Sequence, residues 1–302
     1  MRFTAYAVLL ATILLWAGNW IVGRAIRNDV SPALATLGRV AIVIVSVAPF
    51  ALAGLRQRLA ALSREQWKVL ALAGLSGGGL HLAMQWLALH YTTATSATLF
   101  VSTAPIFILL LAAAFLGERI AALQWLGVAV SFSGIAVIAS GGDPAALASL
   151  SLNRGDLLAV GSMLMFAAYT VTLKRWNDGL HILQFLLVIS CIGAVALSPW
   201  VAWELAHDAR ARLTPAGILA FAYSGFGSFL LSYLGWSYAV RRLGPARAGA
   251  WMHLMPAFAV ALAAVFLGEY PRWFHFAGIA LIIAGVSLAT MTRARGSALR
   301  RS

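Results

Sequence analysis

The chain has 302 residues, of which 62% are hydrophobic and only 10% charged, and its mean hydropathy is +0.87. Soluble globular proteins carry about 25% charged residues, so this composition excludes an ordinary soluble domain and indicates a polytopic membrane protein. The net charge of +13 would suggest nucleic acid in a soluble chain. However, no basic stripe with interleaved aromatic residues lies outside the apolar runs, so we expect no nucleic-acid partner.

Ten apolar segments follow one another along the chain, separated by charged or Pro/Gly-rich breaks. About 20 apolar residues cross a bilayer as a helix, so these segments predict an all-α, polytopic membrane protein with ten transmembrane helices. No cleavable signal peptide is evident, and the first segment is interpreted as an uncleaved helix. The segments lie near 4–23, 32–54, 68–89, 94–116, 121–140, 155–174, 180–203, 215–239, 246–267 and 273–291.

The positively charged residues are distributed unevenly between the two sets of connections. With the N-terminus in the cytosol, the cytosolic connections and tails carry fifteen Lys and Arg residues, and the opposite connections carry six. Because positive residues concentrate on the cytoplasmic side, this bias predicts a multi-pass protein of the cell inner (plasma) membrane with both termini cytoplasmic. The lipid bilayer is then its surrounding partner, and the sequence leaves the oligomeric state open.

One segment of the sequence occurs twice. Pro105–Glu118, PIFILLLAAAFLGE, returns 151 residues later as Pro256–Glu269, PAFAVALAAVFLGE, with nine of fourteen positions identical. About five spans fit into this offset, and because five is odd the second copy enters the bilayer from the opposite side. The sequence therefore predicts two inverted five-helix repeats, an arrangement that secondary transporters use for alternating access. The predicted units are a first repeat at 1–140, a linker at 141–154, a second repeat at 155–291 and a basic cytosolic tail at 292–302.

Glycines keep the register of this repeat. Gly127 and Gly134 lie 151 residues before Gly278 and Gly285. Small residues let helices approach closely in lipid, where no hydrophobic force drives their pairing, so close packing is the expected role of these four. The three consecutive glycines at 77–79 fit either close packing or a hinge.

Several of these features together resemble one family. They are the Trp16-Ala17-Gly18-Asn19 start of the first segment, Arg39 in the second, the glycines of 74–79, and the paired segments that end at Glu118 and Glu269. Over nearly its whole length the chain resembles the EamA-type branch of the drug/metabolite transporter superfamily. Within that branch it is similar to the YddG-like exporters of aromatic and other amino acids. The resemblance implies a central cavity between helices 1, 3, 4, 6, 8 and 9, with helices 5 and 10 at the periphery.

Polar and aromatic residues deep in the predicted spans are the candidates for substrate binding, because polar groups inside a membrane are costly unless paired or hydrated. The Asn19 amide suits a zwitterion and a hydrogen bond to a neighbouring helix equally well. His81 and Gln85 lie one turn apart, on the same predicted face as Gly78. The candidates are Trp16, Asn19, Gly78, His81, Gln85, Ser102, Met165, Tyr169, Phe229, Ser232, Trp236, Trp251 and His253.

Three basic residues in the spans have alternative roles. His81 and His253 are candidates for proton coupling near neutral pH, and the alternative is a neutral imidazole that is bonded to a backbone carbonyl. Arg39 lies seven residues into the second segment. It is expected to serve the structure rather than the substrate, by snorkelling to the surface or by bonding carbonyls of an adjacent helix.

Two acidic residues end the repeated segments. Glu118 and Glu269 each precede a further helix, where a carboxylate can cap exposed N–H groups at the positive end of the helix dipole. Capping is therefore their expected role. The alternative is that they pair with cations and hold a gate shut.

Residue types that are missing from the spans exclude several functions. No Asp or Glu lies near the middle of a span, which disfavours a cation exporter with a central carboxylate. Carriers of sugar phosphates should present several Lys or Arg to the phosphates, so a neutral or zwitterionic small molecule fits better. No HExxH, GxSxG or paired intramembrane Asp occurs, so we expect no enzyme activity and no catalytic residue. Cys191 is the single cysteine, which leaves no Cys-based metal site, and no cofactor or metal is expected.

These observations predict an integral membrane secondary transporter that exports amino acids, aromatic or other neutral ones, and related metabolites. Export is expected to occur by alternating access through a central cavity, with the two five-helix halves rocking about it. The alternatives are an exporter of other small organic metabolites or drugs, and a non-transporting membrane receptor or scaffold.

Overall fold

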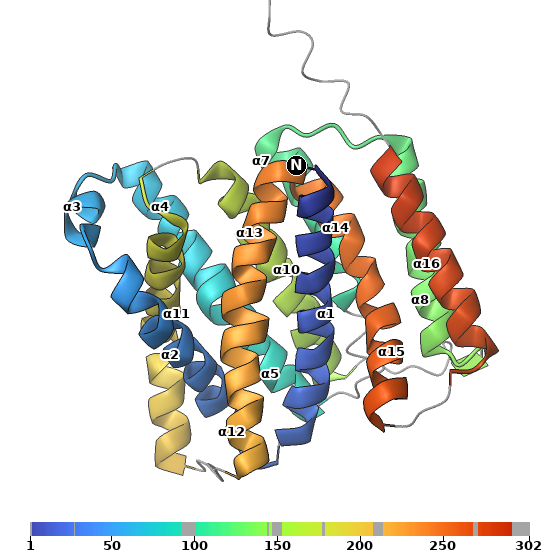
Figure 1. The fold of residues 1–302 in the computed structure, drawn as a ribbon, viewed down its shortest axis with the longest axis horizontal. Helices are drawn as coiled ribbons and strands as arrows, with labels where there is room; N and C mark the ends of the chain where they lie inside the picture. Colours follow the sequence, from blue (N-terminus) through green and yellow to red (C-terminus); the bar gives the residue numbers. More distant parts are fainter. Residues whose placement is uncertain are drawn as a thin grey trace, which may run out of the picture.

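The computed structural model of the chain is a bundle of helices, most of which run between the same two ends of the molecule (Figure 1). The regular elements of the described residues are helices, with no β-strand among them, which confirms the predicted all-α class. The first residue of α1 and the last turn of α16 lie at the same end of the bundle (Figure 1). The structure describes residues 2–26, 28–91, 101–143, 145–146, 153–176, 179–207, 214–267 and 271–291.

The first part of the chain forms long helices, one of which is interrupted by a π-helical segment, η1. Helices that follow one another along the chain through a short connection are antiparallel. The elements are α1 (Arg2–Ile26), α2 (Pro32–Ala51), the short α3 (Leu55–Ala60), the continuous run of α4 (Arg64–Ala73), η1 (Gly74–Leu80) and α5 (His81–Tyr91), then α7 (Ala104–Leu116) and α8 (Ala122–Ala139).

The second part repeats this order, including a π-helical segment, η2, in its corresponding helix. A short 3₁₀ turn, η3, also joins two helices of this part. The elements are α10 (Arg154–Arg175), α11 (Ile182–His207), the continuous run of α12 (Pro215–Ala222), η2 (Tyr223–Leu231) and α13 (Ser232–Leu243), then α14 (Pro245–Trp251), η3 (Met252–Leu254), α15 (Met255–Leu267) and α16 (Trp273–Met291).

Seven helices or helical runs of the described residues are long and apolar enough to cross a membrane, and α7 is a shorter apolar helix. The protein is therefore a multi-pass membrane protein. The predicted segments 68–89, 94–116 and 246–267 coincide with shorter or interrupted helices, and the second of them begins outside the described residues. The seven spans are Phe3–Gly23, Pro32–Ala51, Ala122–Ala139, Arg154–Arg175, Ile182–His207, Gly217–Leu243 and Trp273–Met291.

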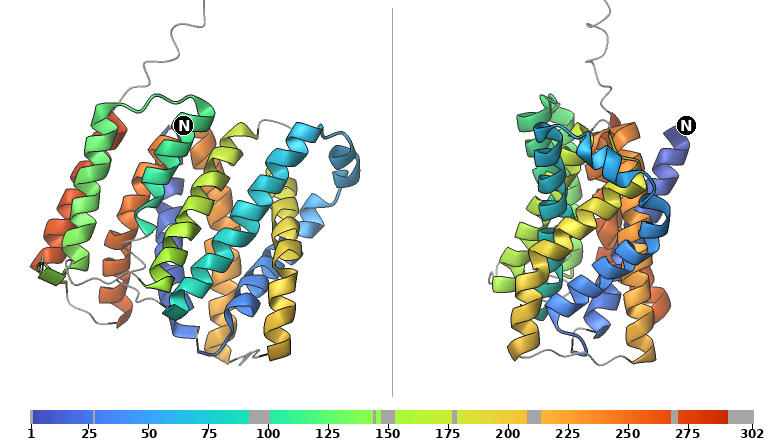
Figure 2. Two further views of the ribbon diagram at one scale, coloured as in Figure 1. Left: turned by 180° about the vertical axis from the view of Figure 1, so that it is seen from behind. Right: turned by 90° about the vertical axis from the view of Figure 1, so that its left-hand side faces the viewer.

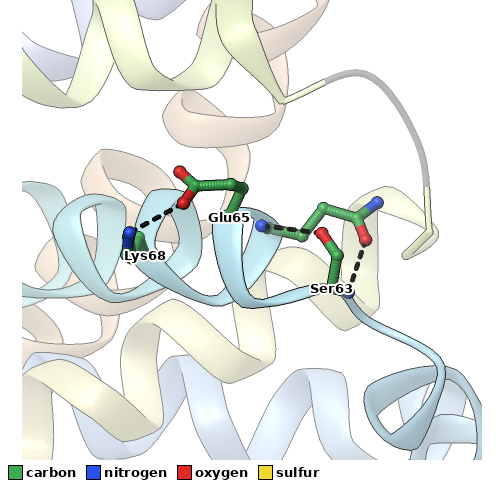
Figure 3. A network of polar contacts seen from close by, with 4 residues as sticks. Ser63, Glu65 and Lys68 are labelled. Atoms are coloured by element: carbon green, nitrogen blue, oxygen red, sulfur yellow. Dashed lines mark hydrogen bonds and ion pairs between the residues drawn. The ribbon is translucent and has the colours of Figure 1, made fainter.

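The start of α4 is fixed by a polar network at the surface (Figure 3). The Ser63 hydroxyl accepts a hydrogen bond from the Gln66 backbone N–H at 3.2 Å, and the Gln66 side chain accepts one from the Ser63 N–H at 2.9 Å. This reciprocal capping box satisfies two N–H groups at the helix start. One turn further, Lys68 donates to Glu65 at 2.7 Å, and this contact lowers the pKa of the exposed Glu65 carboxyl.

Helices α2 and α11 form an antiparallel pair in which α11 caps both ends of α2. The buried Glu204 carboxylate accepts hydrogen bonds from the N–H groups of Ala33 at 3.0 Å and Leu34 at 3.1 Å. At the other end, Gln184 donates to the Ala51 carbonyl at 3.2 Å. A carboxylate at a helix N-terminus satisfies open donors and interacts favourably with the helix dipole. These contacts fix the position of α2 along α11.

Helices α8 and α16 pair through glycine backbones at one edge of the bundle, where the fifth and tenth segments were expected (Figures 1 and 2). A Cβ at Gly127 would lie 2.5 Å from the Gly285 carbonyl oxygen, and a Cβ at Gly134 would lie 2.5 Å from the Gly278 carbonyl oxygen. Residue numbers along the contact rise in α8 and fall in α16, so the two helices are antiparallel. Each glycine is therefore required by the close approach of the other backbone.

The two sequence halves interleave in space. Helix α1 packs on α13, α2 on α11, and α5 on α10, so the main neighbour of each of these helices comes from the other half. The contacts are also reciprocal, because a Cβ at Gly74 would lie 2.6 Å from Ile192 and one at Gly225 would lie 2.6 Å from Ile42. Interleaved halves cannot move as two separate lobes without breaking these interfaces.

Replacing Gly134 by Leu tests the close contact between α8 and α16. The new side chain meets the backbone of α16, so we expect the thermal unfolding midpoint in detergent to fall, with a cost of about 1–3 kcal/mol from overpacking. Ala129→Leu is the matched control, because Ala129 is on the same helix and exposed, and a surface change of this kind costs less than about 0.5 kcal/mol. Equal midpoints for the two variants would contradict the close contact.

Candidate functional site

A small cavity lies inside the bundle, and both sequence halves line it. Its volume is about 20 Å³. A cavity needs about 10–15 Å³, counted in the same way, to hold one water molecule. An amino acid therefore does not fit into the cavity in this conformation. The first half contributes Trp16, Trp20, Arg39, His81, Gln85 and Val101, and the second half contributes Met163, Phe166, Ser228, Tyr233, Met252 and Met255.

Aromatic rings form one wall of the cavity. Trp16 on α1 meets Phe166 on α10 edge-on at 5.2 Å between ring centroids, and Trp236 on α13 lies 5.3 Å from Trp16 and 5.2 Å from Phe166. Tyr233 packs against this group, with its ring 6.4 Å from that of Trp16. Such pairs contribute about 0.5–1.5 kcal/mol beyond their burial, so the wall is a stable contact between α1, α10 and α13.

His81 is held in place by α10. Its Nδ1 lies 2.9 Å from the Ser162 carbonyl oxygen and 2.8 Å from the Ser162 hydroxyl, and that hydroxyl donates to the His81 carbonyl at 3.0 Å. Both residues are buried. A neutral imidazole whose Nδ1–H is bonded to a carbonyl presents Nε2 as an acceptor. This geometry matches the structural alternative considered for His81, a neutral ring bonded to a backbone carbonyl.

Arg39 reaches the cavity from α2 and does not snorkel to the surface. Its side chain is 1% exposed, and one guanidinium nitrogen donates to the Gln85 side-chain oxygen at 3.1 Å. The guanidinium carbon lies 5.7 Å from the centre of the Phe229 ring, which is within the range of a cation–π contact. Arg39 is therefore a cavity residue, although the sequence favoured a structural role for it.

The two π-helical segments carry side-chain hydrogen bonds from neighbouring helices. The Trp16 indole N–H donates to the Ser228 carbonyl in η2 at 2.9 Å, and the Tyr233 hydroxyl donates to the Gly77 carbonyl in η1 at 2.8 Å. Ser232 donates to the Gly227 carbonyl at 2.8 Å. A π-helical turn replaces the regular i→i+4 pairing by i→i+5 bonds, and such segments are frequent at functional sites. The cavity lining includes Ser228 of η2 and His81, which directly follows η1.

Comparison with protein families gives two matches along the chain. The model of the EamA-like transporter family matches residues 3–140 and again residues 153–291. The chain belongs to the EamA-like transporter family. It is thus a member of the drug/metabolite transporter superfamily, as its resemblance indicated, and its family is one of transporters.

Curated relatives extend over nearly the whole chain. A probable terminal-alkyne amino-acid exporter of Streptantibioticus cattleyicolor is 31% identical over 282 residues, which are 93% of this chain and 91% of that protein. An uncharacterized transporter of Archaeoglobus fulgidus is 28% identical over 297 residues, which are 96% of this chain and 98% of the relative. One crystal structure is similar with a TM-score of 0.75 at 19% identity, covering 96% of this chain and 97% of the other. At that identity the likeness concerns the fold alone.

Six of the predicted site residues lie at the cavity or directly behind its wall in this member of the family. Trp16, His81 and Gln85 line it. Tyr169, Phe229 and Trp236 are buried and contact the lining residues through their rings. Ser232 is buried beside them and bonded to the Gly227 carbonyl.

The other predicted site residues lie away from the cavity lining. Asn19 is buried with no hydrogen-bond partner for its side-chain oxygen among the described residues, and both ring nitrogens of the buried His253 likewise have none. Gly78 faces α11 at the Ile189 carbonyl, and Trp251 packs on Tyr6 with ring centroids 5.0 Å apart. Two further candidates, the buried Ser102 and the half-buried Met165, do not line the cavity either.

Glu118 makes no hydrogen bond to α8 within the described residues. The α8 start is capped by Gln124, whose side-chain oxygen accepts from the Ala121 N–H at 2.9 Å. Glu118 lies in the connection before α8, next to Gly244, and its partial burial raises the pKa of its carboxyl. Glu269, for which the same role was predicted, lies outside the described residues.

Sequence reasoning missed much of the lining for a structural reason. Trp20 lies one turn after Trp16, and Phe166 and Met163 lie one and two turns before Tyr169 on the regular helix α10, so helical spacing would have found these three. At η1, η2 and η3 the rotation per residue changes, so a regular helical period points to the wrong face there. For example, Met252 and Met255 line the cavity, while His253 between them does not.

A Ser162→Ala substitution tests how His81 is held. It removes one buried hydrogen bond to the His81 carbonyl, so we expect a lower unfolding midpoint and a loss of about 1 kcal/mol. Ser190→Ala is the matched control, because Ser190 is also buried and its hydroxyl has no hydrogen-bond partner among the residues that the structure describes. Thermal unfolding of both purified variants is the measurement, and a Ser162 variant as stable as the Ser190 variant would refute the contact.

Proposed function

We propose that the protein is a secondary transporter that exports amino acids, aromatic or other neutral ones, and related metabolites by alternating access. The observation that carries the proposal is the internal cavity, to which each sequence half contributes six lining residues among those that the structure describes. A carrier needs a central site that opens to one side at a time. A cavity lined by both halves is where such a site is expected.

The proposed architecture is ten transmembrane helices in two inverted five-helix repeats. Its support is the antiparallel pairing of α8 with α16, together with the reciprocal contacts between η1 and α11 and between η2 and α2. Two equivalent helices that pair antiparallel are related by a two-fold axis within the membrane plane, as inverted repeats require. The excess of positive residues on one set of connections favours both termini in the cytoplasm of an inner-membrane protein.

The moving units in this proposal are mixed bundles rather than the sequence halves. Helix α1 packs with η2, α13 and α15 on one side of the cavity, and α10 packs with η1, α5 and α7 on the other. Most of the cavity lining divides between these two groups, and the exceptions are Arg39 on α2, Val101 before α7 and Met252 in η3. Rocking of one group against the other opens the cavity while the interleaved contacts inside each group persist.

The lining chemistry supports an amphipathic organic substrate. Trp16, Trp20, Phe166 and three methionines offer apolar and polarisable surface, and His81 and Gln85 offer polar groups. The relative from Streptantibioticus cattleyicolor is named a probable terminal-alkyne amino-acid exporter. Substrates of this chemistry are neutral or zwitterionic amino acids with apolar side chains. Transport of other small metabolites, and a receptor or scaffold without transport, are the alternatives that flux measurements separate.

Counterflow in proteoliposomes tests the proposed function. Liposomes loaded with unlabelled L-phenylalanine, L-tryptophan or L-methionine are expected to accumulate the labelled amino acid only when they contain the protein. A pH gradient that drives accumulation would indicate proton coupling, and counterflow without any effect of the pH gradient would indicate transport without proton coupling. Absence of flux for every amino acid tested would contradict amino-acid transport.

A paired substitution links that flux to the cavity. Trp20→Ala is expected to raise the half-saturating concentration of an aromatic amino acid about 10-fold, because one aromatic contact of about 1.5 kcal/mol is lost. Trp125→Ala is the matched control, since Trp125 is an exposed residue of α8 at the edge of the bundle. Equal effects of the two substitutions would show that substrate does not use this cavity.

A further inference from the structure

We infer that Arg39, together with Gln85, is the anchor for the carboxylate of the transported substrate. This inference rests on the proposed transport function and narrows its substrate class to carboxylic acids with an apolar body. It begins from the burial of a cation, since a charged side chain deep in a membrane protein is costly and needs compensating partners.

The buried charge of Arg39 has few compensating partners in this structure. A guanidinium has five N–H donors, and within the described residues one hydrogen bond is made, to the Gln85 side-chain oxygen at 3.1 Å. The Nε atom is buried without a partner, and no carboxylate of the described residues pairs with Arg39. Among the described residues, the Arg39 guanidinium therefore has one polar partner, Gln85, and one aromatic neighbour, the Phe229 ring.

The fold itself does not require this cation. At the start of the two halves the repeat offset is 150 residues, one fewer than further along the chain, so the position equivalent to Arg39 is Ile189, which is fully buried in α11. The same offset relates Ile42 to Ile192, which make reciprocal contacts with Gly225 and Gly74. An apolar residue thus packs at the equivalent place in the second half, so the charge at Arg39 serves the cavity rather than helix packing.

The cavity around Arg39 defines the remainder of the ligand. Among the described residues its lining contains Arg39 and no Asp or Glu, so an organic cation without a carboxylate has no counter-charge there. The lining also contains apolar and aromatic side chains, including Trp16 and Phe166. A carboxylate makes shorter and stronger hydrogen bonds with a guanidinium than an amide does, so an incoming carboxylate displaces Gln85 as the main acceptor.

Substrates with and without a carboxylate test this assignment. L-Phenylalanine, L-tryptophan and L-methionine are compared with their amides as competitors of counterflow by the wild-type protein. We expect each acid to compete about 10- to 100-fold better than its amide, because a hydrogen bond to a charged group is lost. Equal competition by acid and amide would overturn the anchor while leaving transport itself intact.

Substitutions at Arg39 provide the second arm. Arg39→Gln is expected to raise the half-saturating concentration of the acid about 10- to 100-fold and to leave that of the amide within about 2-fold. Arg39→Lys keeps the charge without the bidentate fork and should be intermediate. Arg58→Gln removes an exposed cation of α3 and is the control for net charge.

The outcomes separate the two hypotheses. If the wild type moves none of the three acids, the proposed function fails, and the anchor fails with it. If the wild type moves an acid and Arg39→Gln moves it with unchanged affinity, the anchor alone is refuted. If Arg39→Gln does not fold, the competition between acids and amides in the wild type still decides, and so does Arg39→Lys.

Discussion

The close antiparallel contact of glycine backbones between α8 and α16 is the constraint on which the rest of the architecture depends. Where Gly127 meets Gly285 and Gly134 meets Gly278, no side chain separates the two helices. In lipid, where apolar surface gives no driving force for helix pairing, such contacts select the partner and its direction. In the proposed inverted repeat, this antiparallel pair of equivalent helices relates the two halves, and residues of both halves line the cavity.

The small size of the cavity follows from the same interleaving. Aromatic rings from both halves meet at Trp16, Phe166 and Trp236, and hydrogen bonds from Trp16 and Tyr233 satisfy carbonyls of the π-helical segments. In the proposed transport cycle, a few such contacts break when the site opens, whereas the glycine interfaces persist. The proposed alternating access therefore requires the aromatic contacts to cost less to break than the glycine interfaces.

Much of the fold could be predicted from the sequence, because apolar runs that end at charged residues define helices directly. The segments 155–174 and 273–291 match α10 and α16 closely. The cavity lining was harder to predict from the sequence, since η1, η2 and η3 change the helical rotation and turn Gly78 and His253 away from the cavity. A structural role was predicted for Arg39 because the sequence does not reveal that its neighbours are Gln85 and Phe229.

Accessibility labelling of single cysteines tests the inverted arrangement most directly. In a chain with Cys191 replaced by Ser, Arg119→Cys marks the connection before α8 and Arg272→Cys the connection before α16, and these helices start at opposite ends of the bundle (Figure 1). A membrane-impermeant maleimide added to intact cells is expected to label Arg272→Cys, and to label Arg119→Cys only after permeabilisation. Labelling of both positions from the same side would contradict the inverted repeats and the carrier built on them.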